Sequence, residues 1–148
     1  MAKLRVLLAD DSPEFLQMMS GFLARDSAIE LIGAALTGQD AVKLAAELHP
    51  DLILMDLIMP HTNGIEATRQ IKATPYPPIV IILTGHDTPE YRSKAANAGA
   101  DGFVYKPELF KKLLPLMKHL VTYAKSKHHN RPDESSPFCE SCTHLPLI

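Results

Sequence analysis

Cysteine is scarce in this chain of 148 residues, and the two that occur, Cys139 and Cys142, both stand close to its end. The body of the chain therefore has no disulfide framework. Long hydrophobic runs are also missing, because no apolar stretch approaches the roughly 18 residues that a membrane helix needs. The first residues, MAKLRVLLADD, become acidic too early for a secretory signal. We therefore expect no membrane association and a cytoplasmic location.

An excess of charge of either sign is missing as well. The formal net charge is −2, from 15 basic and 17 acidic residues. This balance offers no electrostatic footprint for nucleic acid or for an anionic membrane surface. The last residues, 125–148, are too few for a helix-turn-helix domain and contain no basic stripe. We therefore predict that this chain does not bind DNA directly, whether it is a single-domain protein or a piece of a larger one.

What the chain does have is a series of short, nearly continuous apolar runs that are rich in Val, Ile and Leu. Runs of about four to eight such residues are typical of strands buried on both faces of a parallel sheet. The runs cover Leu4–Ala9, Ile29–Leu36, Leu52–Met55 and Ile79–Leu83, with a weaker one at Phe103–Tyr105.

Segments with helical periodicity alternate with these runs, and each begins with a residue that commonly starts a helix. Five repeats of strand and helix predict an α/β fold, in which helices cover both faces of a doubly wound, open parallel sheet. The predicted first residues are Ser12, Thr37, Asn63, Thr88 and Lys106.

The last helical segment and the end of the chain differ from the rest. Pro115 lies inside the segment, so we expect either a kink there or a loose first turn before a regular helix that begins at Pro115. From about Lys125 the sequence is polar and has no periodicity. We therefore predict one domain over residues 1–124 and a flexible tail or linker over residues 125–148.

Polar residues stand at the carboxyl ends of four of the five apolar runs. In an open α/β sheet these ends meet at one edge, which is where ligands bind. Three clustered carboxylates repel one another, and Mg²⁺, which prefers oxygen ligands, would remove that penalty. The residues are Asp10 and Asp11, Asp56, Thr84 with Gly85, and Lys106.

This set of residues also indicates a reaction. Asp56 would act as a nucleophile toward phosphorus and form an aspartyl phosphate. Mg²⁺ and Lys106 would neutralise the charge of the transferring group, Thr84 would donate a hydrogen bond to it, and Gly85 would leave room beside it.

Four stretches of the chain resemble the receiver domain of two-component response regulators, and the resemblance covers residues 3 to about 124. The stretches are VLLADDSPEF, DLILMDLIMPHTNG, IILTGH and GADGFVYKP. The resemblance implies a flavodoxin-like sheet of five parallel strands in the order 2-1-3-4-5, flanked by five helices. It implies that Asp56 is phosphorylated and that Asp10, Asp11, Asp56 and the backbone carbonyl of Ile58 hold Mg²⁺.

The same resemblance implies how the phosphoryl group is contacted and how the change is transmitted. Thr84, Gly85 and Lys106 would contact the phosphoryl group, and Thr84 and Phe103 would form the switch. Phe103 matches an aromatic residue that moves inward on activation, although Phe reports by packing alone because it lacks a hydroxyl. Ile58 would hinder an attacking water, whereas His86 would either orient one or simply be exposed.

The partners implied by the resemblance are a histidine kinase or a histidine phosphotransfer protein, which supplies the phosphoryl group. Slow self-dephosphorylation would reverse the modification. The modified domain would shift the surface around its fourth helix, fifth strand and fifth helix, so that this surface binds a downstream protein or a second copy of the chain. Candidate contacts there are Arg92, Lys94 and Tyr105.

Three other functions can be weighed on the same residues. A phosphatase of the haloacid-dehalogenase type would need an Asp two residues after its nucleophile, and that position holds Ile58. A nucleotide-binding module would need a glycine-rich loop such as G-x-x-x-x-G-K-[ST], which is absent. An adaptor that works without phosphorylation stays open, although the complete acid set argues against it.

The tail contains one further pattern. Cys139 and Cys142 in C-x-x-C spacing, with His144 beyond them, form a weak candidate zinc site. A single pair of cysteines is poor evidence for zinc, and a free, reducible tail is the simpler interpretation. A redox dithiol lacks the helix N-terminus that lowers a thiol pKa.

Overall fold

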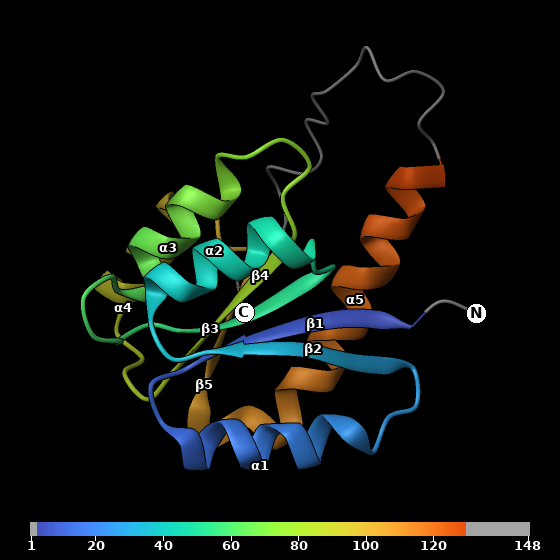
Figure 1. Cartoon of the computed structure of the whole chain (residues 1–148), viewed down its shortest axis with the longest axis horizontal. Coiled ribbons are helices and arrows are strands. Elements are labelled where there is room, and N and C mark those ends of the chain that lie inside the picture. The colour runs from blue at the N-terminus through green and yellow to red at the C-terminus, as the bar shows by residue number, and fades with distance from the viewer. Residues whose placement is uncertain (1–2, 130–148) are drawn as a thin grey trace.

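A computed structural model describes residues 3–129 of the chain, with side chains described as far as Thr122. Its centre is a parallel sheet of five strands in the order β2-β1-β3-β4-β5 (Figure 1). The predicted fold class and strand order are confirmed. The strands are β1 (Leu4–Ala9), β2 (Ile29–Ala35), β3 (Leu52–Asp56), β4 (Ile79–Thr84) and β5 (Gly102–Tyr105).

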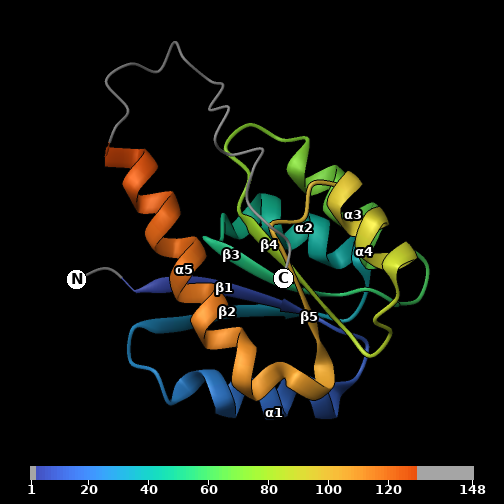
Figure 2. The ribbon, with the colours of Figure 1, turned by 180° about the vertical axis from the view of Figure 1, so that it is seen from behind.

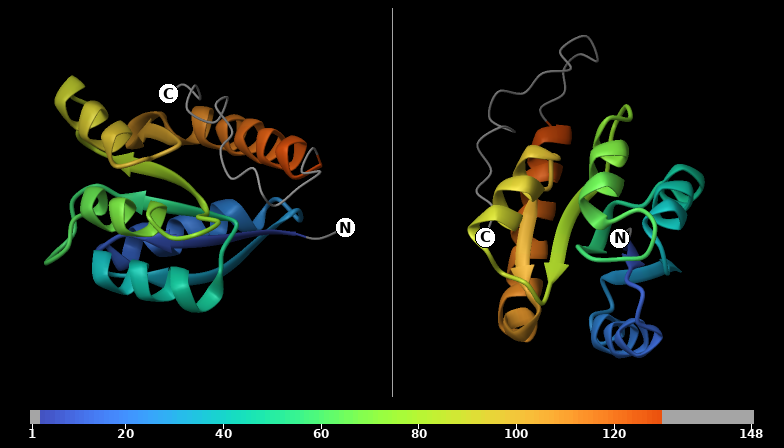
Figure 3. Two further views of the ribbon diagram at one scale, coloured as in Figure 1. Left: turned by 90° about the horizontal axis from the view of Figure 1, so that it is seen from above. Right: turned by 90° about the vertical axis from the view of Figure 1, so that its left-hand side faces the viewer.

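Helices cover both faces of this sheet and divide the core into two layers (Figure 3). Alternate residues of each inner strand enter opposite layers, as the period of a strand requires. Seen from behind, α5 lies beside α1 on one face, away from α2, α3 and α4 (Figure 2). The helices are α1 (Pro13–Ala24), α2 (Gly38–Leu48), α3 (Gly64–Lys72), α4 (Pro89–Asn97) and α5 (Leu109–His129).

Four of the five predicted helix starts are confirmed by the hydrogen bonds of their caps, whereas at Lys106 a short 3₁₀ helix precedes α5, which begins at Leu109. The side chains of Ser12, Thr37, Asn63 and Thr88 each accept a hydrogen bond from the backbone N–H three residues later. Such caps satisfy amide groups that have no partner inside the helix. They also fix where each helix leaves the carboxyl edge of the sheet.

Strand β2 departs from the expectation that every strand is buried on both faces. Most of its residues are half-buried or exposed, whereas β3 is buried throughout. β2 pairs only with β1 and forms an edge of the sheet, but β5 at the other edge is almost wholly buried, so edge position alone does not account for the exposure of β2. The apolar run alone did not show which strands would lie at the edges.

The segment around Pro115 also differs from one of the two expectations. A short 3₁₀ helix, η1 (Lys106–Glu108), leads directly into α5, which begins at Leu109 and contains Pro115 in its interior. A regular helix that begins only at Pro115 is therefore wrong, and the kink stays a prediction. Among the residues that the structure describes, no helix is both long and apolar enough to span a bilayer.

The loop between β3 and α3 folds tightly back onto the end of β3. The Gly64 N–H donates a hydrogen bond to the carbonyl oxygen of Leu57 at 2.9 Å. A Cβ atom at Gly64 would lie 1.9 Å from the carbonyl oxygen of Asp56, so only glycine fits there. Gly38, at the start of α2, approaches the carbonyl of Thr62 in the same loop just as closely, at 2.1 Å.

We expect Gly64→Ala to destabilise the protein by about 1–3 kcal/mol or more, because the new methyl group would displace the backbone at Asp56. Urea unfolding followed by circular dichroism measures the change. Gly21→Ala is the matched control: a Cβ at Gly21, on the exposed side of α1, meets nothing within 4 Å. That substitution should stabilise the protein by about 0.5–1 kcal/mol. Equal stability of Gly64→Ala and wild type would contradict the close approach.

Candidate functional site

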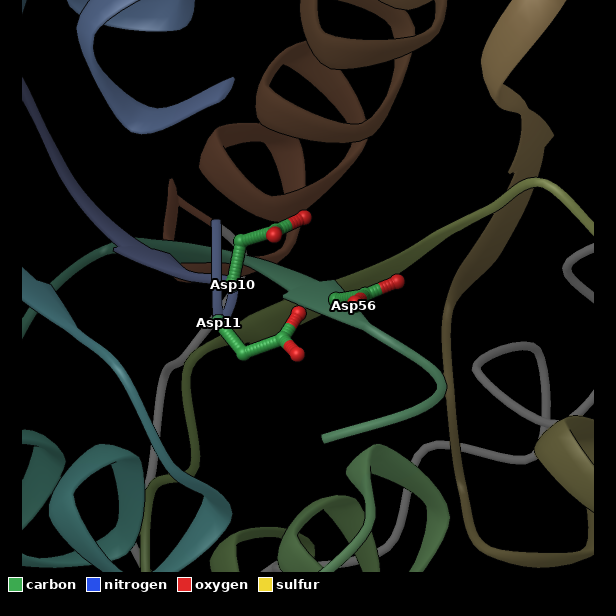
Figure 4. Close-up of side chains that lie close together, drawn as sticks. All are labelled: Asp10, Asp11 and Asp56. Carbon is green, nitrogen blue, oxygen red and sulfur yellow. The ribbon is translucent and has the colours of Figure 1, made fainter. Parts of the chain in front are cut away.

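Three carboxylates meet at the carboxyl edge of the sheet. Asp10 and Asp11 directly follow β1 and Asp56 ends β3, and the two strands pair with Ala9 opposite Met55. One oxygen atom from each carboxylate lies within 4.8 Å of the others. Figure 4 shows the three side chains projecting from the ends of these two strands, with the Asp11 carboxylate directed toward Asp56. The predicted convergence of the three acids is therefore present.

Lys106 reaches the same place from the end of β5. Its Nζ atom donates a hydrogen bond to Oδ2 of Asp10 at 2.8 Å and lies 3.4 Å from Oδ1 of Asp56. The two carboxylates are almost fully buried, with 2% of Asp10 and 7% of Asp56 exposed, whereas Asp11 is exposed. An ammonium group shared by two buried carboxylates partly offsets the cost of removing both from water.

Lys106 offsets the cost of burying these carboxylates only in part, as the pKa of Asp56 shows. Burial is the main reason that this pKa rises from 3.8 to about 6, and the negative charge of Asp10 raises it further. Lys106 acts in the opposite direction, by its charge and by its hydrogen bond. A further cation beside Asp56 would relieve the remaining repulsion. The donors available are carboxylate oxygens, which suit Mg²⁺, so the residues present fit this ion.

Thr84 and Gly85 lie at the same edge of the sheet, one strand away from Asp56. Thr84 ends β4, is 1% exposed, and its Oγ1 atom accepts a hydrogen bond from the backbone N–H of His86 at 3.0 Å. A Cβ atom at Gly85 would meet nothing within 4 Å, so the space beside this residue is open. Both positions agree with the predicted contacts to a phosphoryl group, which stay predictions.

Two predicted neighbours of the site, Ile58 and His86, face solvent. Ile58 is 48% exposed, and His86 is exposed with its ring edge-on to Tyr91 at a centroid distance of 6.3 Å. Exposure of His86 agrees with the simpler of its two interpretations. The role of the Ile58 carbonyl as a metal ligand stays a prediction.

Phe103, the predicted switch residue, is already inside the molecule. Its side chain is 1% exposed, and the Arg92 guanidinium lies over the ring at 4.6 Å from the centroid. Arg92 also donates two hydrogen bonds to the carboxylate of Asp87, at 2.6 and 3.2 Å. Hydrogen bonding from Arg92 lowers the pKa of Asp87. These contacts engage Arg92 within the chain, and its predicted contact with partners stays a prediction.

The other two predicted partner contacts differ in their surroundings. Lys94 forms an ion pair with Glu90 one turn earlier in α4, and Tyr105 is half-buried. Lys94 also lines an open cleft of about 480 Å³ between α3 and α4. The other residues that line the cleft are Leu57, Ile58, Asn63, Ile65, Glu66, Arg69 and Tyr91.

Two residues at the start of α1, the capping residue Ser12 and Phe15 in the first turn, belong to the site although the sequence did not assign them to it. The backbone N–H of Ser12 donates a hydrogen bond to Oδ1 of Asp10 at 2.9 Å. The ring of Phe15 lies under the ammonium group of Lys106, 4.1 Å from Nζ to the ring centroid. No role at the site was predicted for Phe15, and its one signal in the sequence was its position four residues after Asp11.

A model of the response regulator receiver domain matches residues 6–118, more than half of the chain. The chain belongs to the response regulator receiver family. Two curated relatives are similar to this receiver. Protein-glutamate methylesterase/protein-glutamine glutaminase 4 of Geobacter metallireducens is 41% identical over 106 residues, which is 70% of this chain and 30% of the relative. A similarly named protein of Methanospirillum hungatei is 41% identical over 111 residues, 72% of this chain and 31% of the relative.

Solved structures agree with the fold of this receiver. A two-component response regulator of the LuxR family from Aurantimonas has a TM-score of 0.77 and 29% identity, over 82% of this chain and 86% of that one. The response regulator domain of Thermotoga maritima CheB has a TM-score of 0.71 and 30% identity, over 82% and 96%. The receiver spans about a third of the length of the curated relatives it matches.

The candidate zinc residues Cys139, Cys142 and His144 lie outside the described residues, as does most of the predicted tail. The backbone of α5 continues to His129, beyond the predicted domain boundary at residue 124. The boundary and the tail therefore stay predictions.

The raised pKa of Asp56 makes stability depend on pH. Between its unfolded value near 3.8 and its folded value of about 6, the folded state holds the extra proton, so the free energy of unfolding falls as pH rises through this range. We expect Asp56→Asn, which removes the charge, to be about 1–3 kcal/mol more stable than wild type at pH 8 without divalent cations. At pH 4.5 the gap should be much smaller. Urea unfolding at both pH values measures it, and an equal gap at both would show that the charge is not the cause.

Proposed function

We propose that this receiver accepts a phosphoryl group from a phospho-histidine onto Asp56, in the presence of Mg²⁺, and thereby switches a protein-interaction surface. The observation that carries the proposal is the arrangement around Asp56. Its buried carboxylate lies 3.4 Å from the Lys106 ammonium and beside two further carboxylates, and the three acids together suit a divalent cation. Membership of the receiver family supports the same reaction.

In the proposed step, a carboxylate oxygen of Asp56 forms a bond to phosphorus. The bond between phosphorus and the imidazole nitrogen of the donor breaks, and its electron pair stays on that nitrogen. The product is an acyl phosphate on Asp56 and a free imidazole on the donor. Asp56 must be ionised to act as the nucleophile, which its pKa of about 6 allows at neutral pH.

The residues around Asp56 would bind Mg²⁺ and contact the phosphoryl group. Asp10 and Asp11, with Asp56 and the Ile58 carbonyl, would hold Mg²⁺, which when bound neutralises charge on the phosphoryl oxygens. Lys106 would contribute a second positive charge, and it already lies within reach of Asp56. Thr84 would donate its hydroxyl proton to a phosphoryl oxygen, and the open space beside Gly85 would admit that oxygen.

The proposed output follows from the connections of Thr84. Its hydroxyl oxygen already accepts the N–H of His86, in the loop that leads to Asp87 and α4. A new hydrogen bond from Thr84 to a phosphoryl group would therefore change this loop and the surface formed by α4, β5 and α5. We propose that this surface then binds a downstream protein or a second copy of the chain, in the cytoplasm and without DNA binding by the chain itself.

The relatives from Geobacter and Methanospirillum are named as methylesterases, but the matched part is 30% and 31% of each. We infer that the matched part in this chain serves as a phosphoacceptor and does not itself carry a methylesterase activity. Self-phosphorylation from a small donor and slow loss of the phosphoryl group are the only reactions that we propose for it.

Incubation with Mg²⁺ and acetyl phosphate should add one phosphoryl group to the wild-type protein, measured as intact mass. The group should be absent in Asp56→Asn and absent when Mg²⁺ is removed with a chelator. Asp51→Asn is a suitable control, because Asp51 precedes β3 at the opposite end of that strand. Unchanged wild-type mass, under conditions that label a known receiver, would favour an adaptor that works without phosphorylation.

Mg²⁺ binding can be tested separately from phosphorylation. At a Mg²⁺ concentration of about ten times the dissociation constant, we expect the melting temperature of the wild type to rise by about 3–8 °C. Asp11→Asn should lose this shift without a large loss of stability in the absence of Mg²⁺, because Asp11 is exposed. Potassium chloride of matched ionic strength is the control for screening. A full shift in Asp11→Asn would remove this residue from the metal site.

A further inference from the structure

The Lys106 ammonium has a third partner besides its two carboxylates. Its Nζ atom lies 4.1 Å from the centroid of the Phe15 ring, on the side of α1. An ammonium group this close to the face of an aromatic ring is attracted by the ring's electron distribution. The Lys106 side chain is 25% exposed and Phe15 is half-buried, so the contact is only partly screened by water.

The ring itself is held in a defined place by the first turn of α1. The N–H of Phe15 donates a hydrogen bond to Oγ of the capping residue Ser12 at 3.2 Å. The N–H of Ser12 in turn donates to Oδ1 of Asp10, the carboxylate whose Oδ2 accepts from Lys106. The ring also packs against the core between the sheet, α1 and α5. Phe15, Asp10 and Lys106 are therefore fixed relative to one another.

This arrangement matters because lysine carries its charge on a flexible stem of four carbons. Many rotamers would carry the ammonium group into solvent, and each productive encounter would then cost conformational entropy. Asp10 draws the group from one direction and the Phe15 ring from another. Together they leave Nζ close to Asp56, where charge would develop on an incoming phosphoryl group.

We propose that Phe15 is a positioning residue for phosphoryl transfer, whose ring holds the Lys106 ammonium beside Asp56 before the donor arrives. This inference rests on the proposed function of Asp56 and adds to it a residue that acts through Lys106. The part of the ring that matters is its π face, which a leucine side chain of similar bulk does not have.

The kinetic test compares three variants by the rate of phosphorylation with acetyl phosphate at saturating Mg²⁺. Phe15→Leu should slow the reaction about three- to tenfold, the range expected for loss of a half-buried contact of an ammonium with a ring. Phe15→Tyr keeps the ring and should stay within about twofold of wild type. Phe22→Leu is the matched control, since Phe22 is also half-buried on α1 but contacts Phe110 edge-on. It should leave the rate unchanged.

A spectroscopic readout separates this inference from the proposed function. Protons held over an aromatic ring are shifted upfield, so the ε-methylene protons of Lys106 should be shifted upfield in NMR spectra of wild type and Phe15→Tyr. The shift should be lost in Phe15→Leu and kept in Phe22→Leu. If the wild type takes no phosphoryl group at all, the proposed function fails, and the Lys106 shifts alone decide whether Phe15 positions the ammonium.

Three results would overturn the inference. The first is a Phe15→Leu protein that reacts as fast as wild type. The second is a Phe15→Tyr or Phe22→Leu protein that is slowed as much as Phe15→Leu, because the effect would then come from general packing of α1. The third is a Lys106 methylene signal that does not move in Phe15→Leu.

Discussion

The buried carboxylate of Asp56 is the constraint on which this structure depends. The fold removes it from water and places it beside Asp10, which raises its pKa to about 6. Lys106 makes the arrangement tolerable, because its ammonium reaches both acids from the end of β5. The tight loop after β3 and the cap of α1 then fix the positions of the same groups. A buried carboxylate with a raised pKa gains free energy from any reaction or bound cation that neutralises its charge, which is why such groups are common at functional sites.

The charged groups of the site could be predicted from the sequence, whereas their supporting contacts could not. Asp10, Asp56 and Lys106 each end an apolar run, and parallel strands bring such ends to one edge whatever the details of packing. The contact of Phe15 with Lys106 joins residues far apart in the chain and depends on two side-chain rotamers. No local pattern encodes such a contact, because many rotamers of both residues suit the same backbone.

In the fold, too, local features could be predicted from the sequence, whereas features that depend on the whole topology could not. The apolar runs predicted all five strands, and the caps predicted where four helices begin, because both are local effects. The exposure of β2 and the burial of β5, the two edge strands, depend on the arrangement of the whole fold and not on the apolar runs themselves. Gly38 also carried no signal, since its closeness to the Thr62 carbonyl arises only when α2 meets the loop after β3.

The position of Phe103 has a consequence for how a signal would leave this domain. In this structure the ring already occupies an inner place and is covered by a guanidinium, so the predicted inward movement of Phe103 would have to start from a different state. A rearrangement that starts from this state would instead separate Arg92 from Asp87 or from the ring. The ion pair of Arg92 with Asp87 and the contact of Arg92 with the ring together keep Phe103 covered, and salt would weaken the first of these contacts by screening its charges.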